Sequence, residues 1–471
     1  MKNNTAEKLE KLPLRKLFLV MAVPSVLAQL INVLYNIVDR IYIGHIKDVG
    51  SLALTGVGVT FPIIMVVSAF SAFAGQGGAP LASIELGAKN YKKAEKILGN
   101  STALLIVFAI VLTIFFQIFK TPLLYAFGAS DNVIKYAHDY IGLYLYGTIF
   151  VMLSLGLNTF ISGQGNAKVA MLSVLIGAVT NIILDPIFIF VLGMGVKGAA
   201  LATVISQALS AIWVVYFLLS KKSVIKIKIE NLNLEKEILK KTGALGISPF
   251  IMQSTESLVL LTLNSGLQKY GGDIYVGSMS ILTSVLQLIT VPVSGITQGI
   301  QPVISYNFGA GNRKRVLQTF KGMLGVCLTV TIMMGGIGVI FPEIYVGIFT
   351  DSKELFDLTS KFMPIFVLGM VIFGIQQAIQ GTFLALGQAK YSIFIALLRK
   401  VILLVPLAVI LPIFMGVKGI YYAEPIADIT SVSIASITFL LTYKKILKSR
   451  GMKKWGLFIA LKIYFYYLYI S

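Results

Sequence analysis

The chain has 471 residues, of which 56% are hydrophobic and only 13% are charged. Soluble globular domains typically carry about 25% charged residues, so this composition excludes an ordinary water-soluble surface. The formal net charge is +20, and the positions of the basic residues decide between a nucleic-acid partner and a membrane.

Apolar stretches long enough to cross a bilayer recur along the whole chain. A membrane helix needs about 20 predominantly apolar residues, and the sequence holds twelve such stretches. They predict an all-α polytopic membrane protein with twelve transmembrane helices. In chain order, the predicted spans are centred on residues 17–43, 53–80, 97–119, 133–157, 169–192, 198–219, 242–267, 275–300, 318–341, 359–385, 391–414 and 418–442.

Lysine and arginine are concentrated in alternate loops between these spans. The intervening loops hold mostly single lysines. Cytoplasmic loops of membrane proteins carry an excess of Lys and Arg. The protein is therefore predicted to lie in a cell membrane with both termini on the cytoplasmic side. The expected partner is therefore the lipid bilayer and not nucleic acid. The basic segments are residues 1–16, 89–96, 221–241, 313–315 and 444–454.

The two halves of the chain share a sequence pattern. LGAKNYKKA at 86–94 is matched by FGAGNRKRV at 308–316, and MGVKG at 194–198 recurs identically at 415–419, with offsets of 222 and 221 residues. Each half contains six predicted spans, so both halves begin on the same side of the membrane. This pattern predicts two parallel six-helix repeats, a recurrent plan among transporters.

The repeat divides the chain into lobes and connecting segments. Two complete halves in one chain predict a functional monomer, and the single cysteine, Cys327, excludes a disulfide framework. The last sixteen residues are too short and too interrupted for a thirteenth span, so an interfacial helix is expected there. The predicted segments are a cytoplasmic N-terminus at 1–16, an N-lobe at 17–219, a lysine-rich cytoplasmic linker at 220–241, a C-lobe at 242–444 and a cytoplasmic or interfacial tail at 445–471.

Acidic residues inside predicted spans occur mainly in the first half. An ionised carboxylate at the centre of a membrane helix costs about 2.5–3.5 kcal/mol, so such residues usually face a cavity or a partner. Asp39 follows Tyr35 by one helical turn, and Asp185 follows Asn181 by the same spacing, which places each pair on one helix face. Carboxylate, amide and hydroxyl oxygens together suit a monovalent cation or shared protons. The predicted coupling site comprises Asp39, Asn181, Asp185, Thr203, Tyr35 and Asn158.

Two structural alternatives apply to these acids. Asp39 could form an ion pair with the adjacent Arg40, although neighbouring helical residues diverge. Asp185 precedes Pro186 and could instead act as the N-cap of a new helix. The apolar sequence on both sides of Asp185 favours a kinked helix over a cap.

The acids of the first half have no counterparts in the second, where Asn264 corresponds to Asp39. Glu256 is the main acid of the seventh span, with the alternative that it is hydrogen-bonded only for packing. Glu424 and Asp428 share one face of the twelfth span and are expected to line the same cleft. The predicted substrate cleft comprises Glu256, Gln253, Asn32 and Met252.

These residues carry a resemblance to a known family. The pattern Pro24, Tyr35 and Asp39 in the first span, the run NIILDPIFIF from Asn181 to Phe190, and MGVKGAALAT from Met194 are similar to those of multidrug and toxic compound extrusion (MATE) transporters. The similarity extends over nearly the whole chain and favours the branch with an acidic residue on the first helix. In the tenth span, where another branch has an aspartate, this chain has Gln376, Gln377 and Gln380.

The resemblance implies a V-shaped, two-lobe antiporter that exports lipophilic, cationic compounds in exchange for H+ or Na+ by alternating access. It implies that Asp39, Asn181, Asp185 and Thr203 surround the coupling ion, that Na+ is the only metal to expect, and that no cofactor is needed. The alternatives are a narrow-substrate metabolite exporter and a flippase of a lipid-linked intermediate. A flippase cleft should hold several basic residues for a diphosphate, and here Arg399 and Lys400 are the main intramembrane candidates.

Motifs for catalysis are missing from the sequence. It has no metal-spaced histidines, no Gly-x-Ser-x-Gly elbow and no P-loop. The Gly-x-Gly-x-x-Gly match at 193–198 lies between two predicted membrane helices, without the strand that a dinucleotide site requires. We therefore expect no enzymatic activity, and transport driven by an existing gradient.

Overall fold

The computed structural model describes the backbone of residues 4–468 and the side chains of residues 6–448. All regular secondary structure in this part of the chain is helical, without strands. The N-terminal lobe contains α2 (Leu14–Gly44), α3 (Gly50–Gly87), α4 (Tyr91–Ala126), α5 (Ile134–Tyr146), α6 (Thr148–Gly163), α7 (Ala167–Pro186), the π-helical segment η1 (Ile187–Val191) and α8 (Val196–Leu219).

The C-terminal lobe repeats this order. A short helix, α1 (Asn4–Lys11), precedes the first lobe, and a 3-10 turn, η2 (Ile229–Asn231), lies in the connection between lobes. The second lobe contains α9 (Lys236–Gly271), α10 (Asp273–Gly309), α11 (Arg313–Ile340), α12 (Pro342–Phe349), α13 (Lys353–Val367), α14 (Met370–Ala385), α15 (Ala389–Leu397), the π-helical segment η3 (Leu398–Leu404), α16 (Val405–Met415) and α17 (Val417–Leu468).

The prediction of twelve spans is confirmed. In the described residues, ten helices are long and apolar enough to cross a membrane, and two further spans are broken helix pairs. The pair α5 and α6 bends by 59°, and the pair α13 and α14 bends by 43°. The bends flank Gly147 and Gly369, which are 222 residues apart, so they occur at equivalent positions of the repeat.

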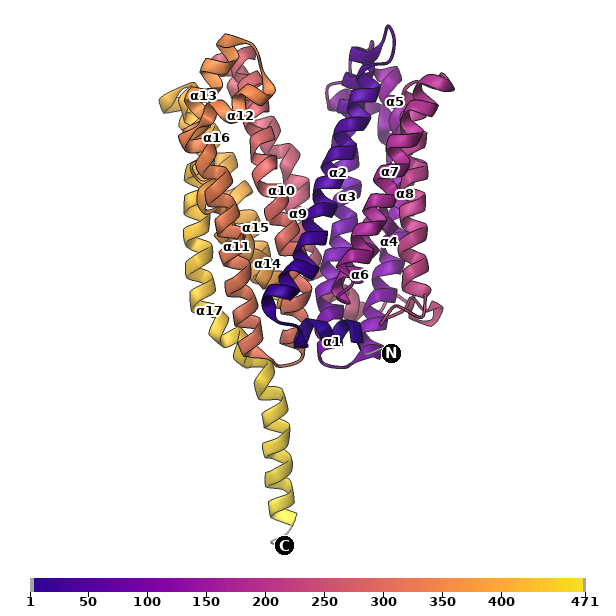
Figure 1. The fold of residues 1–471 in the computed structure, drawn as a ribbon, viewed down its shortest axis with the longest axis vertical. Helices are drawn as coiled ribbons and strands as arrows, with labels where there is room; N and C mark the ends of the chain where they lie inside the picture. The colour runs from indigo at the N-terminus through magenta and orange to yellow at the C-terminus, as the bar shows by residue number, and fades with distance from the viewer. Residues whose placement is uncertain (1–3, 469–471) are drawn as a thin grey trace.

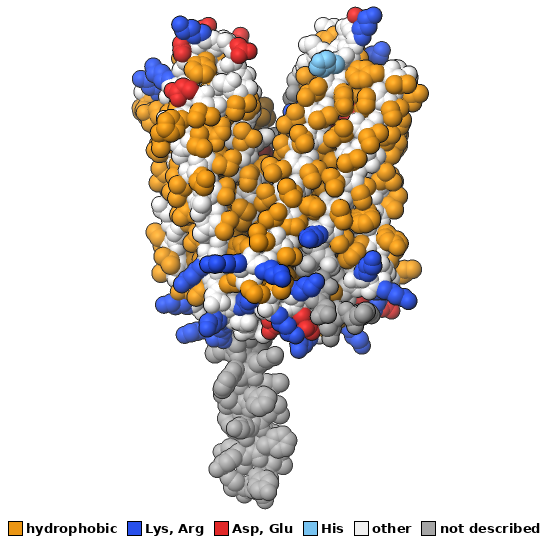
Figure 2. All heavy atoms as spheres, in the orientation of Figure 1, with side chains coloured by type: hydrophobic (Ala, Val, Ile, Leu, Met, Phe, Trp, Pro, Cys, Tyr) orange, Lys and Arg blue, Asp and Glu red, His pale blue; other side chains and the backbone are white. Residues whose placement is uncertain are grey.

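The two lobes form a V (Figure 1). They touch at the end where α1 lies and diverge toward the opposite end, where Figure 2 shows the cleft between them. Across the interface α3 packs on α9 and α10 packs on α2, which is the same contact made twice by the repeat. On the face drawn in Figure 2, hydrophobic side chains cover both lobes, and most of the Lys and Arg side chains gather around the closed end of the V.

Two glycines allow the lobes to meet at the closed end. A Cβ atom added to Gly87 would lie 1.9 Å from the carbonyl oxygen of Tyr306, and one added to Gly309 would lie 1.9 Å from that of Ile84. Tyr306 follows Ile84 by the same 222 residues that separate the glycines. The closed end is therefore a two-fold-like crossing in which each helix end packs directly on the backbone of the other.

The connecting segments lie at this closed end. The chain after α8 turns beneath the N-lobe, where the Gln164 side-chain oxygen accepts hydrogen bonds from the backbone N–H groups of Val224 and Ile225 at 2.7 and 3.2 Å. Residues 220–235 do not form a span. Helix α17 runs on to Leu468, and the predicted interfacial position of the tail concerns side chains outside the described residues.

Candidate functional site

A cavity of about 380 Å³ lies between the lobes and extends into the N-lobe. Its walls come from α2, α3, α6, α7 and α8 of the N-lobe and from α9 and α10 of the C-lobe. None of the described residues that line it is charged, and serine, threonine, asparagine and glutamine supply most of its polar groups. The polar lining includes Ser25, Gln29, Asn32, Tyr35, Ser68, Gln76, Asn158, Asn181, Thr203, Ser206, Gln207, Ser210, Gln253, Gln298, Gln301 and Ser305.

Asp39 and Asp185 come together next to this cavity. Helix α2 packs against α7, and this contact places the two carboxyl groups next to one another, where they interact directly. Both are buried, with Asp39 8% exposed and Asp185 fully enclosed. Two ionised carboxylates repel one another at such a separation, whereas one proton between them converts the repulsion into a hydrogen bond. The pair is therefore suited to hold a proton or a cation.

Asn181 and Thr203 complete the group. The Asn181 side-chain nitrogen donates to Asp185 Oδ1 at 3.2 Å and lies 3.5 Å from Thr203 Oγ1. Asn158 lines the same cavity and donates to the Ala170 carbonyl oxygen at 3.1 Å. The structure thus brings the predicted coupling residues to one region of the N-lobe.

Several oxygens of this region are buried without a hydrogen-bond partner. Buried polar atoms are nearly always paired, so each unpaired oxygen needs an explanation. Carboxylate and amide oxygens are ligands that hard cations prefer. A carboxylate oxygen can also bind a proton, and an amide oxygen can accept a hydrogen bond from the protonated group. The donor set therefore fits Na+ as well as H+. The unpaired atoms are Asp39 Oδ1, Asp185 Oδ2, Asn181 Oδ1 and Asn158 Oδ1.

The two structural alternatives for the acids are not what the structure shows. Among the described residues no ion pair joins Asp39 to Arg40, and the Arg40 guanidinium lies over the ring of Phe61, 5.5 Å from its centroid. Asp185 lies in the last turn of α7 and is not an N-cap. Pro186 has no backbone N–H and cannot donate the regular helical hydrogen bond. After it the backbone continues as the wider π-helical turn η1, so the helix runs on past the proline.

Two contributors were not predicted from the sequence. The Tyr140 hydroxyl from α5 interacts with Thr203, and the Gln207 side chain interacts with Tyr35 and accepts a hydrogen bond from Ser154 at 2.7 Å. Gln207 is one turn after Thr203 on α8. Tyr140 is the middle one of three tyrosines spaced four residues apart in an apolar helix, which is the signal that indicates a shared face.

The residues predicted for the substrate cleft divide into two groups. Asn32 and Gln253 line the cavity, whereas Glu256 and Met252 lie outside the described lining. Both instead contact Lys400, whose ammonium pairs with the Glu256 carboxylate and donates to the Met252 carbonyl oxygen at 2.9 Å. Glu256 therefore pairs with another residue of the protein, as in the alternative that it is hydrogen-bonded for packing, and it does not face the cavity.

The expectation that Glu424 and Asp428 line the same cleft was wrong. They are 3% and 0% exposed and lie inside the C-lobe, where both bind the guanidinium of Arg399. Their shared helix face was predicted correctly, but it turns toward η3 and away from the other lobe, because α17 packs along η3 and α16.

An all-helical bundle of two repeated lobes, with a polar cavity between them and buried carboxylates beside it, defines a membrane transporter. A family model described as MatE matches residues 24–187 and 249–410, one stretch in each lobe. The chain belongs to this family, the multidrug and toxic compound extrusion transporters.

Individual relatives agree over nearly the full length. The chain is 26% identical to the multidrug export protein MepA of Staphylococcus aureus (strain NCTC 8325 / PS 47), over 94% of this chain and 97% of the relative. It is 25% identical to MepA of Staphylococcus haemolyticus (strain JCSC1435), over 92% and 95%. A solved outward-facing structure of a multidrug resistance MATE family transporter of the MOP superfamily superposes with a TM-score of 0.87 at 22% identity, over 95% of this chain and 99% of that one.

Proposed function

We propose that this protein is a secondary antiporter of the cell membrane that exports lipophilic, cationic compounds in exchange for H+ or Na+ by alternating access. The observation that carries the proposal is the Asp39–Asp185 pair, which is buried behind the wall of the cavity with unpaired oxygens on both side chains. The names of the curated relatives, which are multidrug export proteins, support the substrate class.

The coupling follows from charge. When both carboxyl groups are ionised, the N-lobe carries two negative charges in a medium of low dielectric constant, which favours uptake of a proton or Na+. Ion binding and the presence of a cationic substrate in the adjoining cavity then oppose one another. An ion can shift the balance between the two lobe orientations only if it binds to one of them more tightly than to the other. The proposed difference arises because the Asp39–Asp185 pair is accessible from opposite sides of the membrane in the two orientations.

The orientation of the chain follows from its basic residues. Lys and Arg gather around the closed end of the V, and this is the end that the positive-inside rule assigns to the cytoplasm. Both termini are then cytoplasmic, and the cavity faces outward. In this state a coupling ion reaches the site from outside and substrate leaves to the same side.

Contacts in the C-lobe disfavour a lipid-linked diphosphate as the cargo. Arg399 is bound to two carboxylates and Lys400 to one, so neither is available for a phosphate group. The cavity itself offers only neutral polar groups among the described residues. Neutral amides and hydroxyls can solvate an ammonium group, but they do not neutralise a diphosphate.

Efflux from liposomes tests the proposal. Purified protein would be reconstituted with a fluorescent lipophilic cation inside, and a sodium gradient and a pH gradient would be imposed separately. We expect one of them to drive efflux, and that one names the coupling ion. Absence of efflux under both gradients, in liposomes whose protein still binds the dye, would overturn the proposed antiport.

A further inference from the structure

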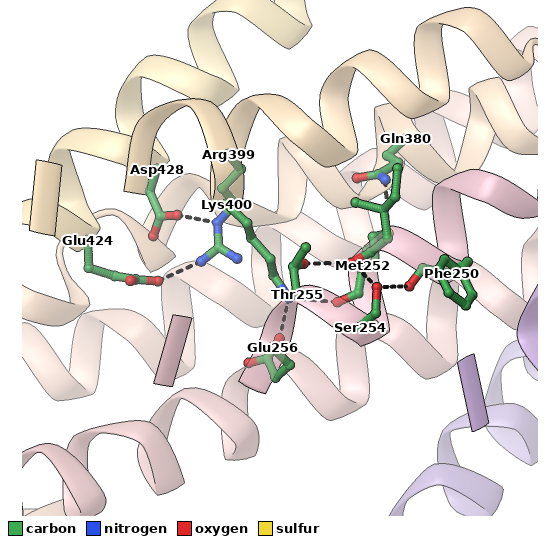
Figure 3. Close-up of polar contacts among 11 residues, drawn as sticks. Phe250, Met252, Ser254, Thr255, Glu256, Gln380, Arg399, Lys400, Glu424 and Asp428 are labelled. Carbon is green, nitrogen blue, oxygen red and sulfur yellow. Dashed lines mark hydrogen bonds and ion pairs between the residues drawn. The ribbon is translucent and has the colours of Figure 1, made fainter. Parts of the chain in front are cut away.

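The C-lobe contains a buried charged cluster of its own (Figure 3). The Arg399 guanidinium donates from Nε to Asp428 Oδ1 at 2.5 Å and from Nη2 to Glu424 Oε1 at 2.7 Å. It also lies over the ring of Phe373, 4.6 Å from the centroid. Arg399 belongs to η3 and the two acids to α17, so the cluster joins the two halves of one helical hairpin.

The repeat places this cluster opposite the proposed coupling site. With the offset of 221 that relates the two MGVKG sequences, Glu424 corresponds to Thr203 and Asp428 to Gln207. Thr203 and Gln207 are two of the groups that surround the Asp39–Asp185 pair. The C-lobe acids therefore occupy the same face of the equivalent helix, at the same depth, as the polar wall of the N-lobe site.

The charges of the buried cluster do not cancel. Two carboxylates share one guanidinium, which leaves one negative charge if both acids are ionised. Asp428 is 0% exposed, and its Oδ2 atom has no hydrogen-bond partner. An unpaired buried charge is strongly unfavourable, so a proton or a cation must compensate it.

The groups around the cluster indicate whether a proton or a metal cation compensates its excess negative charge. Beyond Arg399, the charged neighbours of Glu424 are Lys400 and Glu256, which pair with one another. Helix α14 presents the Phe373 ring and the Gln376 amide, the latter bound to Ser431 at 2.6 Å. A metal ion beside Asp428 would face the guanidinium at short range and be repelled by it. A proton meets the same positive charge, but it forms a covalent O–H bond with one carboxylate oxygen and needs no further ligands, whereas a hard metal ion needs several oxygen ligands at once.

We propose that Glu424 and Asp428 share one exchangeable proton, so that the transporter has a second coupling site in the C-lobe opposite the one in the N-lobe. The inference rests on the proposed antiport. In each cycle one carboxylate oxygen of the pair forms an O–H bond with a proton from the side to which the cleft is open, and this proton reaches the enclosed pair past Glu256, whose side chain is 65% exposed and is a charged neighbour of Glu424. It loses that proton to water on the other side, while Arg399 remains bound throughout.

The number of protons moved per substrate tests this proposal. Proteoliposomes with equal sodium on both sides and a pH gradient of one unit would be followed until net substrate flux stops. Each coupled proton contributes about a factor of ten to the limiting substrate ratio per pH unit. For Glu424→Gln and Asp428→Asn we expect the limiting ratio to fall by about that factor, because the remaining acid and Arg399 form a neutral pair that no longer exchanges a proton.

A structural role would give a different result. Variants that only loosen the C-lobe would transport more slowly or unfold at lower temperature, but they would reach the limiting ratio of the wild type. That outcome would overturn the second site. The exposed Asp351 supplies the control Asp351→Asn, which should leave the ratio unchanged.

A neutral variant keeps the test decisive if a single substitution fails to fold. Arg399→Gln combined with Glu424→Gln and Asp428→Asn contains no charge in the cluster, so its folding does not depend on an ion pair. We expect it to show the same lowered ratio as the single variants, and a wild-type ratio would refute the proposal. Absence of gradient-driven efflux in the wild type would instead refute the antiport itself, which separates the two failures.

Discussion

Asp39 and Asp185 lie on helices that are far apart in the sequence and side by side in the N-lobe. The residue spacing predicted which face of each helix carries polar groups, and the resemblance to a family predicted that the faces meet. Tyr140 and Gln207 escaped prediction because their contribution depends on how α5 and α8 pack, and a tyrosine or glutamine in an apolar span is also common without a role. The sequence thus predicted the acids of this region and the neutral groups Tyr35, Asn158, Asn181 and Thr203, but not Tyr140 and Gln207.

The first prediction concerns the acid pair. We expect Asp39→Asn and Asp185→Asn to lower gradient-driven efflux by about tenfold or more, a loss of about 1.4 kcal/mol, because an amide holds neither the charge nor an exchangeable proton. Initial rates of dye efflux from proteoliposomes would measure this. Asp351→Asn serves again as the control, and unchanged rates in both acid variants would contradict the assigned role.

The second prediction concerns Tyr140. Removal of its hydroxyl in Tyr140→Phe takes one polar neighbour away from Thr203, and a full hydrogen bond, which contributes about 0.5–1.5 kcal/mol, sets the upper limit of the effect. We expect the concentration of coupling ion that gives half-maximal efflux to change by about two- to tenfold, while the maximal rate stays near that of the wild type. Tyr144→Phe is a matched control, since Tyr144 stacks on Tyr140 one turn away. Equal effects of both variants would mean that packing and not the hydroxyl matters.

At the scale of elements, the helices interrupt their regular geometry at equivalent places. The breaks at Gly147 and Gly369 follow the repeat offset, so the repeat already contained the information to predict the second break from the first. A single glycine in an apolar stretch is nevertheless a weak signal, because glycine is frequent in membrane helices. The π-helical segments η1 and η3 lie on equivalent spans but at different turns, and neither could be predicted, since their positions depend on local packing around Pro186 and Arg399.

The third prediction concerns the glycines at the closed end. Alanine at position 87 or 309 would overlap a backbone carbonyl of the opposite lobe, and overpacking of this kind costs about 1–3 kcal/mol. We expect Gly87→Ala and Gly309→Ala to shift the balance of orientations away from the observed one by about fivefold or more. Labelling of a cysteine introduced at the buried Thr242 would report the opening, in a background that lacks Cys327.

Gly325 supplies the control for this experiment, because a Cβ atom added there meets nothing within 4 Å. Gly325→Ala tests the effect of a helical glycine replacement as such and should label like the parent protein. Slow labelling in the variants at 87 and 309, equal to that of the control, would show that the crossing adjusts without cost.

For the whole molecule, the twelve spans, the two lobes and their parallel relation were predicted from hydropathy, loop charge and the repeat. Span length is determined by the thickness of the membrane, and the order of the repeats can be read along the chain, so neither feature depends on knowing the packing. The partner of each lobe surface was not predictable. The expected position of Glu424 and Asp428 in the cleft was wrong because helix periodicity gives a face but not the neighbour that the face contacts.

The fourth prediction concerns movement of the lobes as units. Gln29 of α2 and Gln298 of α10 meet across the interface, with Nε2 of the first donating to Oε1 of the second at 3.0 Å. Cysteines at both positions, in a background without Cys327, joined by a short thiol-cleavable linker, should hold the lobes as they are. We expect efflux to fall to the level of protein-free liposomes and to recover after reduction. Turnover that continues while the linker is intact would rule out a movement about this contact.

The V shape also determines where the membrane potential acts. In the proposed orientation, water in the open arm of the V carries the outside potential down to the cavity, so the voltage falls mainly across the closed half where the lobes touch. A full crossing of one elementary charge is worth about 2.3 kcal/mol per 100 mV. If the closed end lies on the cytoplasmic side, as proposed, a coupling ion that reaches Asp39 and Asp185 from outside crosses little of the field. Voltage therefore acts mainly on the rate of lobe reorientation, and the affinity for the external ion stays nearly independent of it.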